Sequence, residues 1–73
     1  MTWNYRIMKR DLDGVTVYEI HEVYYKDNGE VEMWTEEPVS FDGFRSSSPE
    51  KLIEQVKNIL EDCTEHSILD YDV

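Results

Sequence analysis

The tripeptide Asp27-Asn28-Gly29 lies between two segments that are rich in β-branched and aromatic residues. Asn-Gly in this position favours a tight turn, because asparagine and glycine tolerate the positive φ angles that a two-residue hairpin loop requires. The sequence therefore predicts an antiparallel hairpin made of residues 15–26 and 30–35. This feature restricts the fold strongly, since it fixes both the direction and the register of two strands.

Two further segments complete the predicted fold. Residues 3–10 alternate in polarity and end at a turn-forming group, residues 11–14, which predicts another strand and a four-residue loop. Ser48-Pro49-Glu50 favours a helix start, because serine caps the helix and proline fits its first position. Apolar residues then recur at helical spacing: Leu52, Ile53, Val56, Ile59, Leu60 and Cys63. We expect an α+β fold, a three-stranded antiparallel meander with one amphipathic helix on one face (βββα), in one domain over residues 1–63 with an acidic tail over residues 64–73.

The loop lengths predict which side chains share a face of the sheet. A two-residue loop at Asn28-Gly29 places Val23 opposite Trp34, and the four-residue loop places Ile7 opposite Tyr18. The same registers pair Tyr24 with Met33, Tyr25 with Glu32, His21 with Glu36 and Tyr5 with Ile20. One face, expected under the helix, carries Trp3, Tyr5, Ile7, Tyr18, Ile20, Tyr24, Val31 and Met33. The other carries Asn4, Arg6, Met8, Val17, Glu19, His21, Val23, Tyr25, Glu32, Trp34 and Glu36.

The second face predicts a protein-binding surface. One helix cannot cover both faces, and between Glu19 and Asp42 the chain has eight carboxylates against one lysine, a local charge of −7 within a total of −10. Aromatic residues inside a charged rim are typical of protein interfaces. The alternative is that the acidity only keeps a small domain soluble and monomeric. The residues expected to contact a partner are Glu19, His21, Val23, Tyr25, Asp27, Glu30, Glu32, Trp34, Glu36, Glu37 and Asp42.

The sequence offers little for catalysis or for a metal. Cys63 and His66 have a spacing found in zinc sites, but apart from the isolated His21 no second pair of ligands accompanies them. The acids around Cys63 oppose thiolate formation. We therefore expect no enzyme, no cofactor and no metal. The strong negative charge argues against direct nucleic-acid binding. One cysteine, with neither a signal peptide nor a membrane span predicted, favours a cytoplasmic protein.

The predicted layout resembles the small HicB-like domain over about residues 3–62. The most suggestive stretch runs from Val39-Ser40-Phe41-Asp42-Gly43 to Ser48-Pro49-Glu50-Lys51-Leu52. The chain also looks like short, acidic, uncharacterised bacterial and phage proteins that carry Trp3-Asn4-Tyr5-Arg6, Ile20-His21-Glu22-Val23-Tyr24-Tyr25 and Trp34-Thr35-Glu36-Glu37-Pro38-Val39. HicB-like antitoxins neutralise a small basic RNA-cleaving toxin, and the full-length members usually add a DNA-binding segment that this sequence lacks.

These observations predict a small non-enzymatic inhibitor or adaptor that docks on the basic surface of another protein. Its most concrete form is a mimic of nucleic-acid charge, of the anti-CRISPR or anti-restriction type, that blocks a nuclease or another nucleic-acid-binding protein. The alternative is a HicB-like antitoxin or regulatory homodimer, which pairs through the same sheet face and neutralises a small basic toxin.

Overall fold

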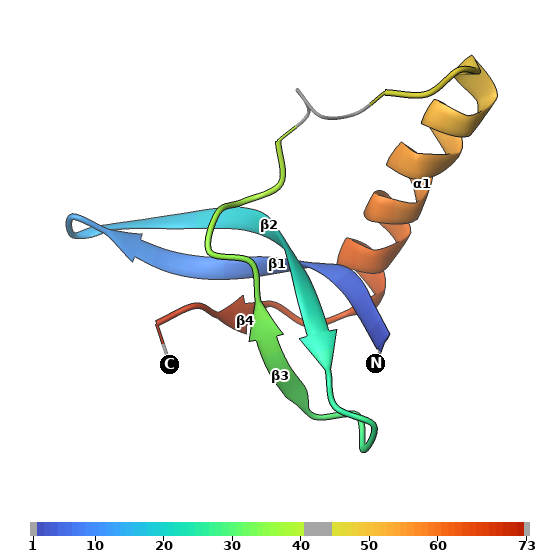
Figure 1. Ribbon diagram of the computed structural model, residues 1–73. Coiled ribbons are helices and arrows are strands. Elements are labelled where there is room, and N and C mark those ends of the chain that lie inside the picture. Colours follow the sequence, from blue (N-terminus) through green and yellow to red (C-terminus); the bar gives the residue numbers. More distant parts are fainter. Residues whose placement is uncertain (1, 41–44, 73) are drawn as a thin grey trace.

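The computed structural model describes residues 2–40 and 45–72. Its elements in chain order are β1 (Thr2–Leu12), β2 (Val15–Tyr25), β3 (Val31–Trp34), α1 (Pro49–Glu65) and β4 (Leu69–Asp70), as Figure 1 shows. The strands form a four-stranded sheet in the order β3-β2-β1-β4. The predicted α+β class is confirmed. The predicted all-antiparallel, three-stranded sheet is wrong, because β4 pairs in parallel with the edge of β1.

The hairpin of β1 and β2 has a shorter loop than the sequence predicts. The loop contains only Asp13 and Gly14, whose φ angles are 52° and 83°, as expected for a two-residue turn that follows the twist of the strands. The predicted four-residue loop and the pairing of Ile7 with Tyr18 are therefore wrong, and Ile7 lies opposite Ile20. The register moves by two residues, so each side chain keeps its predicted face.

The hairpin of β2 and β3 follows the prediction near its centre and departs from it at the turn. Two predicted pairs are confirmed, Val23 with Trp34 and Tyr24 with Met33. A register shift then places Tyr25 opposite Val31 instead of Glu32. The backbone N–H of Lys26 donates to the carbonyl of Glu30 at 2.8 Å and Gly29 has a φ of 89°, so the loop has three residues and the glycine occupies its left-handed position.

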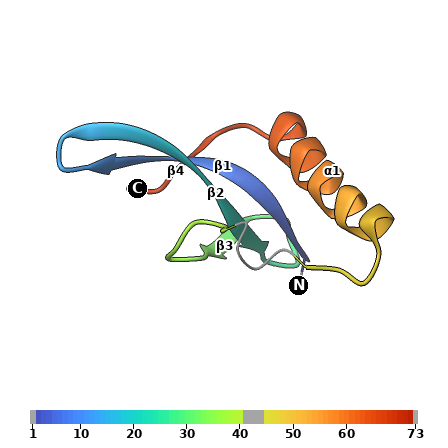
Figure 2. The ribbon, with the colours of Figure 1, turned by 90° about the horizontal axis from the view of Figure 1, so that it is seen from above.

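The helix start is confirmed, but the expected packing of the helix is wrong. Ser48 is extended and its Oγ accepts from the N–H of Lys51 at 3.1 Å, which satisfies one of the free amides of the first turn. Figure 2 shows α1 beside one end of the curled sheet, with the loop of β1 and β2 extending away from it. Of the six apolar helix residues, only Ile59 is buried. A helix placed at one end of a sheet cannot bury its whole apolar stripe against that sheet.

The main core lies on the sheet face that the sequence leaves open. This face, which we call the inner face, carries Arg6, Met8, His21 and Val23, and all four side chains are buried. The opposite face, which packs against α1 and carries Ile7 and Ile20, is the outer face. The predicted distribution of burial is therefore reversed.

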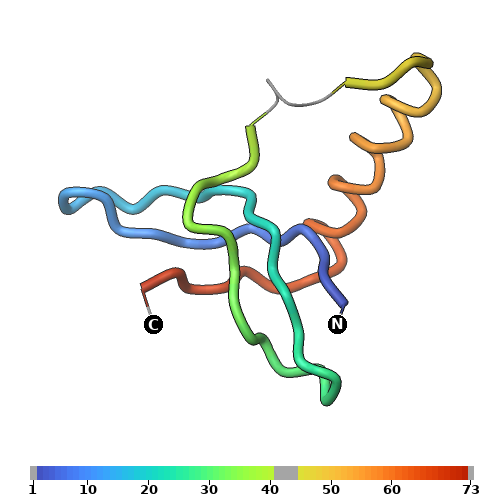
Figure 3. Tube along the Cα trace, viewed as in Figure 1, coloured from blue at the N-terminus to red at the C-terminus, as the bar shows by residue number. Residues whose placement is uncertain are grey.

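The segment after α1 closes the inner face. In Figure 3 this segment returns alongside β1. The backbone N–H of Tyr71 donates to the carbonyl of Lys9 at 2.8 Å, and the N–H of Asp11 donates to the Asp72 carboxylate at 2.8 Å. Residues 69–72 of the expected acidic tail therefore form β4 and, with Tyr71, a cover over the core. We call these four residues the lid.

Candidate docking surfaces

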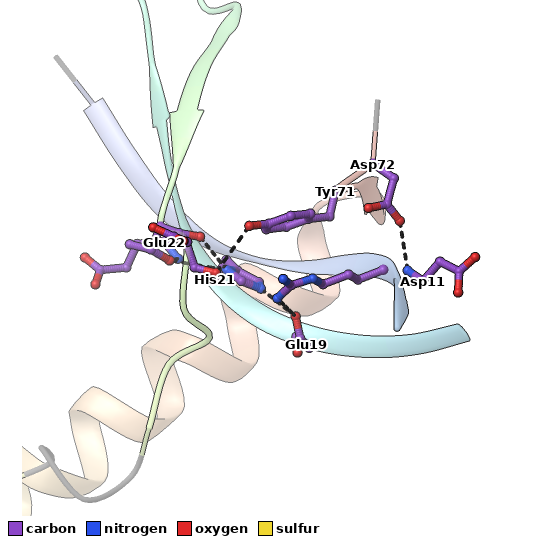
Figure 4. A network of polar contacts seen from close by, with 9 residues as sticks. Asp11, Glu19, His21, Glu22, Tyr71 and Asp72 are labelled. Carbon is purple, nitrogen blue, oxygen red and sulfur yellow. Dashed lines mark hydrogen bonds and ion pairs between the residues drawn. The ribbon is translucent and has the colours of Figure 1, made fainter. Parts of the chain in front are cut away.

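Tyr71 covers the centre of the inner face. Its ring centroid lies 5.5 Å from that of His21 and 5.9 Å from that of Trp34, and the guanidinium carbon of Arg10 lies 4.2 Å from the centre of the ring. Figure 4 shows Tyr71 and His21 side by side, with Glu19 on the far side of the imidazole. Aromatic and cation–π contacts of this kind stabilise a packed interior. The inner face is therefore core.

His21 is fully buried and both of its ring nitrogens face hydrogen-bond acceptors. Nδ1 lies 2.8 Å from the carbonyl oxygen of Thr35, and Nε2 lies 3.0 Å from the Glu19 carboxylate. The hydrogen bond from His21 is the largest cause that lowers the pKa of Glu19 below its ordinary value, and the charge of Arg10, whose Nη1 lies 3.6 Å from the same oxygen, also lowers it. The imidazole therefore contacts Thr35 and Glu19, and not Glu36, which the predicted register places opposite it. The histidine is a satisfied structural group with no free nitrogen for catalysis.

Arg6 is a second polar group of the inner face, and it connects the sheet to the segment after α1. Its Nη2 donates to the carbonyl of Ser67 at 2.6 Å and to the Ser67 hydroxyl at 2.9 Å, and its Nη1 donates to the Tyr25 hydroxyl at 3.2 Å. The Tyr25 hydroxyl in turn donates to Asn4 at 2.8 Å. This network explains how a guanidinium can be buried at low cost.

The structure divides the predicted contact residues into two groups. His21 and Val23 are fully buried. Tyr25 and Trp34 are partly buried, and Trp34 lines an open, mostly apolar pocket of about 350 Å³ with Val31, Leu69 and Asp70. Glu19 is held between His21 and Arg10. The expected exposure of His21 and Val23 is wrong, because the segment after α1, which the predicted fold lacks, packs on the inner face. That these residues contact a partner stays a prediction. The acids that remain exposed are Asp27, Glu30, Glu32, Glu36 and Glu37. Asp42 lies outside the described residues.

The exposed aromatic surface lies on the outer face instead. Trp3 is 49% exposed and Met33 is 54% exposed. The ring centroids of Trp3 and Tyr24 are 6.4 Å apart, and Tyr24 is the cross-strand neighbour of Met33. We call these three side chains the hairpin patch. The sequence predicts these three side chains beneath the helix, and the only signal against this placement is that one helix is too narrow to cover a full sheet face.

The hairpin patch is bordered by a polar cleft and by acids. A cleft of about 270 Å³ is lined by Tyr5, Glu22, Glu37 and Gln55 among others. Glu22 accepts a hydrogen bond from the Tyr24 hydroxyl at 3.2 Å. Burial raises the pKa values of the Tyr5 and Tyr24 phenols, and the charge of Glu22 raises both further. Both phenols are therefore protonated hydrogen-bond donors at neutral pH.

A second open surface lies on the other side of α1 and is almost wholly apolar. A groove of about 330 Å³ between the helix and the outer face is lined by Ile7, Ile20, Val56, Ile59, Leu60, Cys63 and Thr64. It shares Val56 and Leu60 with a groove of about 470 Å³ on the helix surface that also includes Leu52, Ile53 and Lys57. We call this continuous surface the helix groove. Its lining contains no carboxylate.

The geometry around Cys63 and His66 does not form a reactive or metal-binding centre. Burial, followed by the charge of Asp62, raises the pKa of the Cys63 thiol, which disfavours the thiolate. The ring nitrogens of His66 lie 2.8 Å from the carbonyl of Asp62 and 3.2 Å from the Asn4 amide nitrogen. Among residues 2–40 and 45–72, no three side chains of the metal-binding types are grouped to hold an ion. Over the same ranges, α1 is too short and too polar to cross a membrane.

Comparisons with protein families, with curated proteins and with solved structures found no match. The resemblance to the HicB-like domain therefore stays a prediction.

Proposed function

We propose that this protein is a non-enzymatic, cytoplasmic binding domain that docks on the basic surface of another protein through the hairpin patch and the acids around it. The observation that carries the proposal is the exposure of Trp3 and Met33 next to the most acidic segment of the chain. Large apolar side chains supply most of the binding energy of a protein interface, and the charges around them direct the encounter.

The acids near the patch have little internal compensation. Lys26 and Glu30 approach only to 4.0 Å, and both side chains are more than half exposed, so this pair leaves most of the local charge in place. Within the part of the chain that the structure describes, no ion pair involves Glu32, Glu36 or Glu37. A basic partner would therefore meet a net negative field over the β2–β3 hairpin and the residues that follow it.

The charge also indicates the class of partner. Proteins that bind DNA or RNA carry basic grooves, and an acidic surface with an apolar centre can occupy such a groove in place of the nucleic acid. We therefore propose a nuclease or another nucleic-acid-binding protein as the target. A HicB-like antitoxin role would use the same complementarity, with a small basic toxin as the partner.

The test combines capture with competition. The purified chain is immobilised and incubated with a bacterial extract at low salt, and the bound proteins are eluted with duplex DNA or with RNA. We expect basic nucleic-acid-binding proteins that either nucleic acid or raised salt displaces, and that a Met33→Arg variant does not retain. Retention that neither salt nor nucleic acid reverses, or that Met33→Arg leaves unchanged, contradicts the proposal.

The charge component has its own test on the purified complex. Reversal of two exposed acids of the β2–β3 hairpin, Glu30→Lys with Glu32→Lys, should lower the association rate constant about tenfold at low ionic strength and flatten its salt dependence. The matched control is Glu50→Lys with Glu54→Lys, which makes the same change in net charge on α1. Equal effects of the two double variants would show that total charge, and not this surface, directs binding.

A further inference from the structure

The apolar stripe of α1 is largely uncovered. Ile53 is 67% exposed, Leu60 is 63% exposed and Val56 is 44% exposed, whereas only Ile59 of this helix is buried. An amphipathic helix of a globular protein normally buries its apolar stripe, because packing of that stripe against the rest of the protein supplies most of the stability of the helix. The uncovered residues form the helix groove together with Ile7 and Ile20 of the outer face.

The total surface of the chain is larger than the average for a folded monomer of its mass. A folded monomer of 8.7 kDa is expected to expose about 4,700 Å², whereas this chain exposes 5548 Å². The excess of roughly 800 Å² equals the area that one partner contributes to a protein interface of standard size. The chain therefore has enough surplus surface for one stable interface.

We propose that a second copy of this chain occupies the helix groove, so that two α1 helices pack antiparallel about a two-fold axis. The exposed positions Ile53, Val56, Lys57 and Leu60 follow the spacing of a helix seam and lie symmetrically about the point between Val56 and Lys57. In an antiparallel pair, Ile53 then faces Leu60 of the partner subunit. Such self-complementarity is what a two-fold interface requires.

The charge of the groove favours a second copy over a basic protein. The lining of the helix groove contains Lys57 and no carboxylate, so a basic partner would gain no electrostatic attraction there. The acids nearest the hairpin patch are those of the clefts lined by Tyr5 and Gln55, namely Glu22, Glu37 and Asp62, and they lie on the opposite side of the helix. Two copies can therefore approach through their least charged surfaces.

Sedimentation equilibrium over a range of protein and salt concentrations tests the dimer. We expect a particle of twice the chain mass, with a dissociation constant in the micromolar range or below. Raised salt should strengthen it, because salt screens the repulsion between two chains of charge −10. Docking on a basic protein should instead weaken with salt, so failure of one proposal is distinguishable from failure of the other.

Two variants and one control locate the interface. Leu60→Glu and, independently, Ile53→Glu should raise the dissociation constant of the dimer roughly 100-fold, because each places an unpaired carboxylate in an apolar seam. Both side chains are exposed in the single chain, so its circular dichroism should not change. The matched control is Met33→Glu, which should keep the dimer. A wild-type chain that is monomeric at millimolar concentration and high salt overturns the proposal, as does a Leu60→Glu chain that dimerises like the wild type.

Discussion

Glu19 is an acidic residue whose charge stabilises the fold of the chain itself. Its carboxylate accepts from buried His21 and lies near Arg10, and these contacts lower its pKa from the ordinary value of 4.5. A carboxylate whose pKa is lower in the folded state than in the unfolded state adds stability above the unfolded pKa. That stability is lost as the pH falls through the folded pKa.

Replacement of this carboxylate should therefore have a pH-dependent cost. We expect Glu19→Gln to lower the free energy of unfolding at pH 7 by about 1–2 kcal/mol, measured by urea denaturation. The difference from the wild type should close as the pH falls below 4.5, because the wild-type carboxyl then becomes neutral as well. Glu32→Gln, at an exposed acid of the β2–β3 hairpin, is the control and should be nearly neutral. A difference that stays constant down to pH 3 would contradict this role.

At the scale of the element, β4 is short but it holds the lid in place. Its two residues pair with Met8 and Lys9 of β1, and this pairing brings Tyr71 over His21 and Trp34. The strand thus positions one aromatic ring that separates the inner face from water.

The lid can be tested through Tyr71. We expect Tyr71→Ala to lower the free energy of unfolding by about 3 kcal/mol, because it removes an aromatic ring from a packed site. Tyr71→Phe should cost less than about 1 kcal/mol, since the hydroxyl makes only a long 3.4 Å bond to the carbonyl of Glu36. The urea midpoints of the two variants give both values. An alanine variant as stable as the phenylalanine variant would show that the ring does not close the core.

The elements differ in how far sequence could predict them. The hairpin of β2 and β3 and the helix start at Ser48 have local signals, a glycine turn and a capping serine, and both were predicted. β4 has no such signal, because a two-residue parallel strand depends on a partner about sixty positions away. The two-residue length of the loop at Asp13-Gly14 could not be predicted, because residues 11–14 suit a four-residue turn equally well.

At the scale of the whole molecule, the prediction failed on which face is core. The parity of the register was right for β1, β2 and residues 33–34, but the register shift pairs Val31 with Tyr25 and so places Val31 on the inner face instead of the predicted outer face. The error came from treating α1 as the only available cover, whereas the segment that contains Tyr71 covers the inner face and α1 covers only part of the outer face. Tyr25 and Trp34, expected to contact a partner, are therefore partly buried, whereas Trp3 and Met33, expected beneath the helix, are exposed.

The most direct test of this account compares the two tryptophans of the free chain. Trp34→Phe leaves Trp3 as the only indole, and Trp3→Phe leaves Trp34. The account predicts that acrylamide quenches the fluorescence of Trp3 several times more efficiently than that of Trp34, with emission at longer wavelength for Trp3. Equal quenching, or a Trp34 more accessible than Trp3, would contradict the closed inner face and with it the placement of the docking surface.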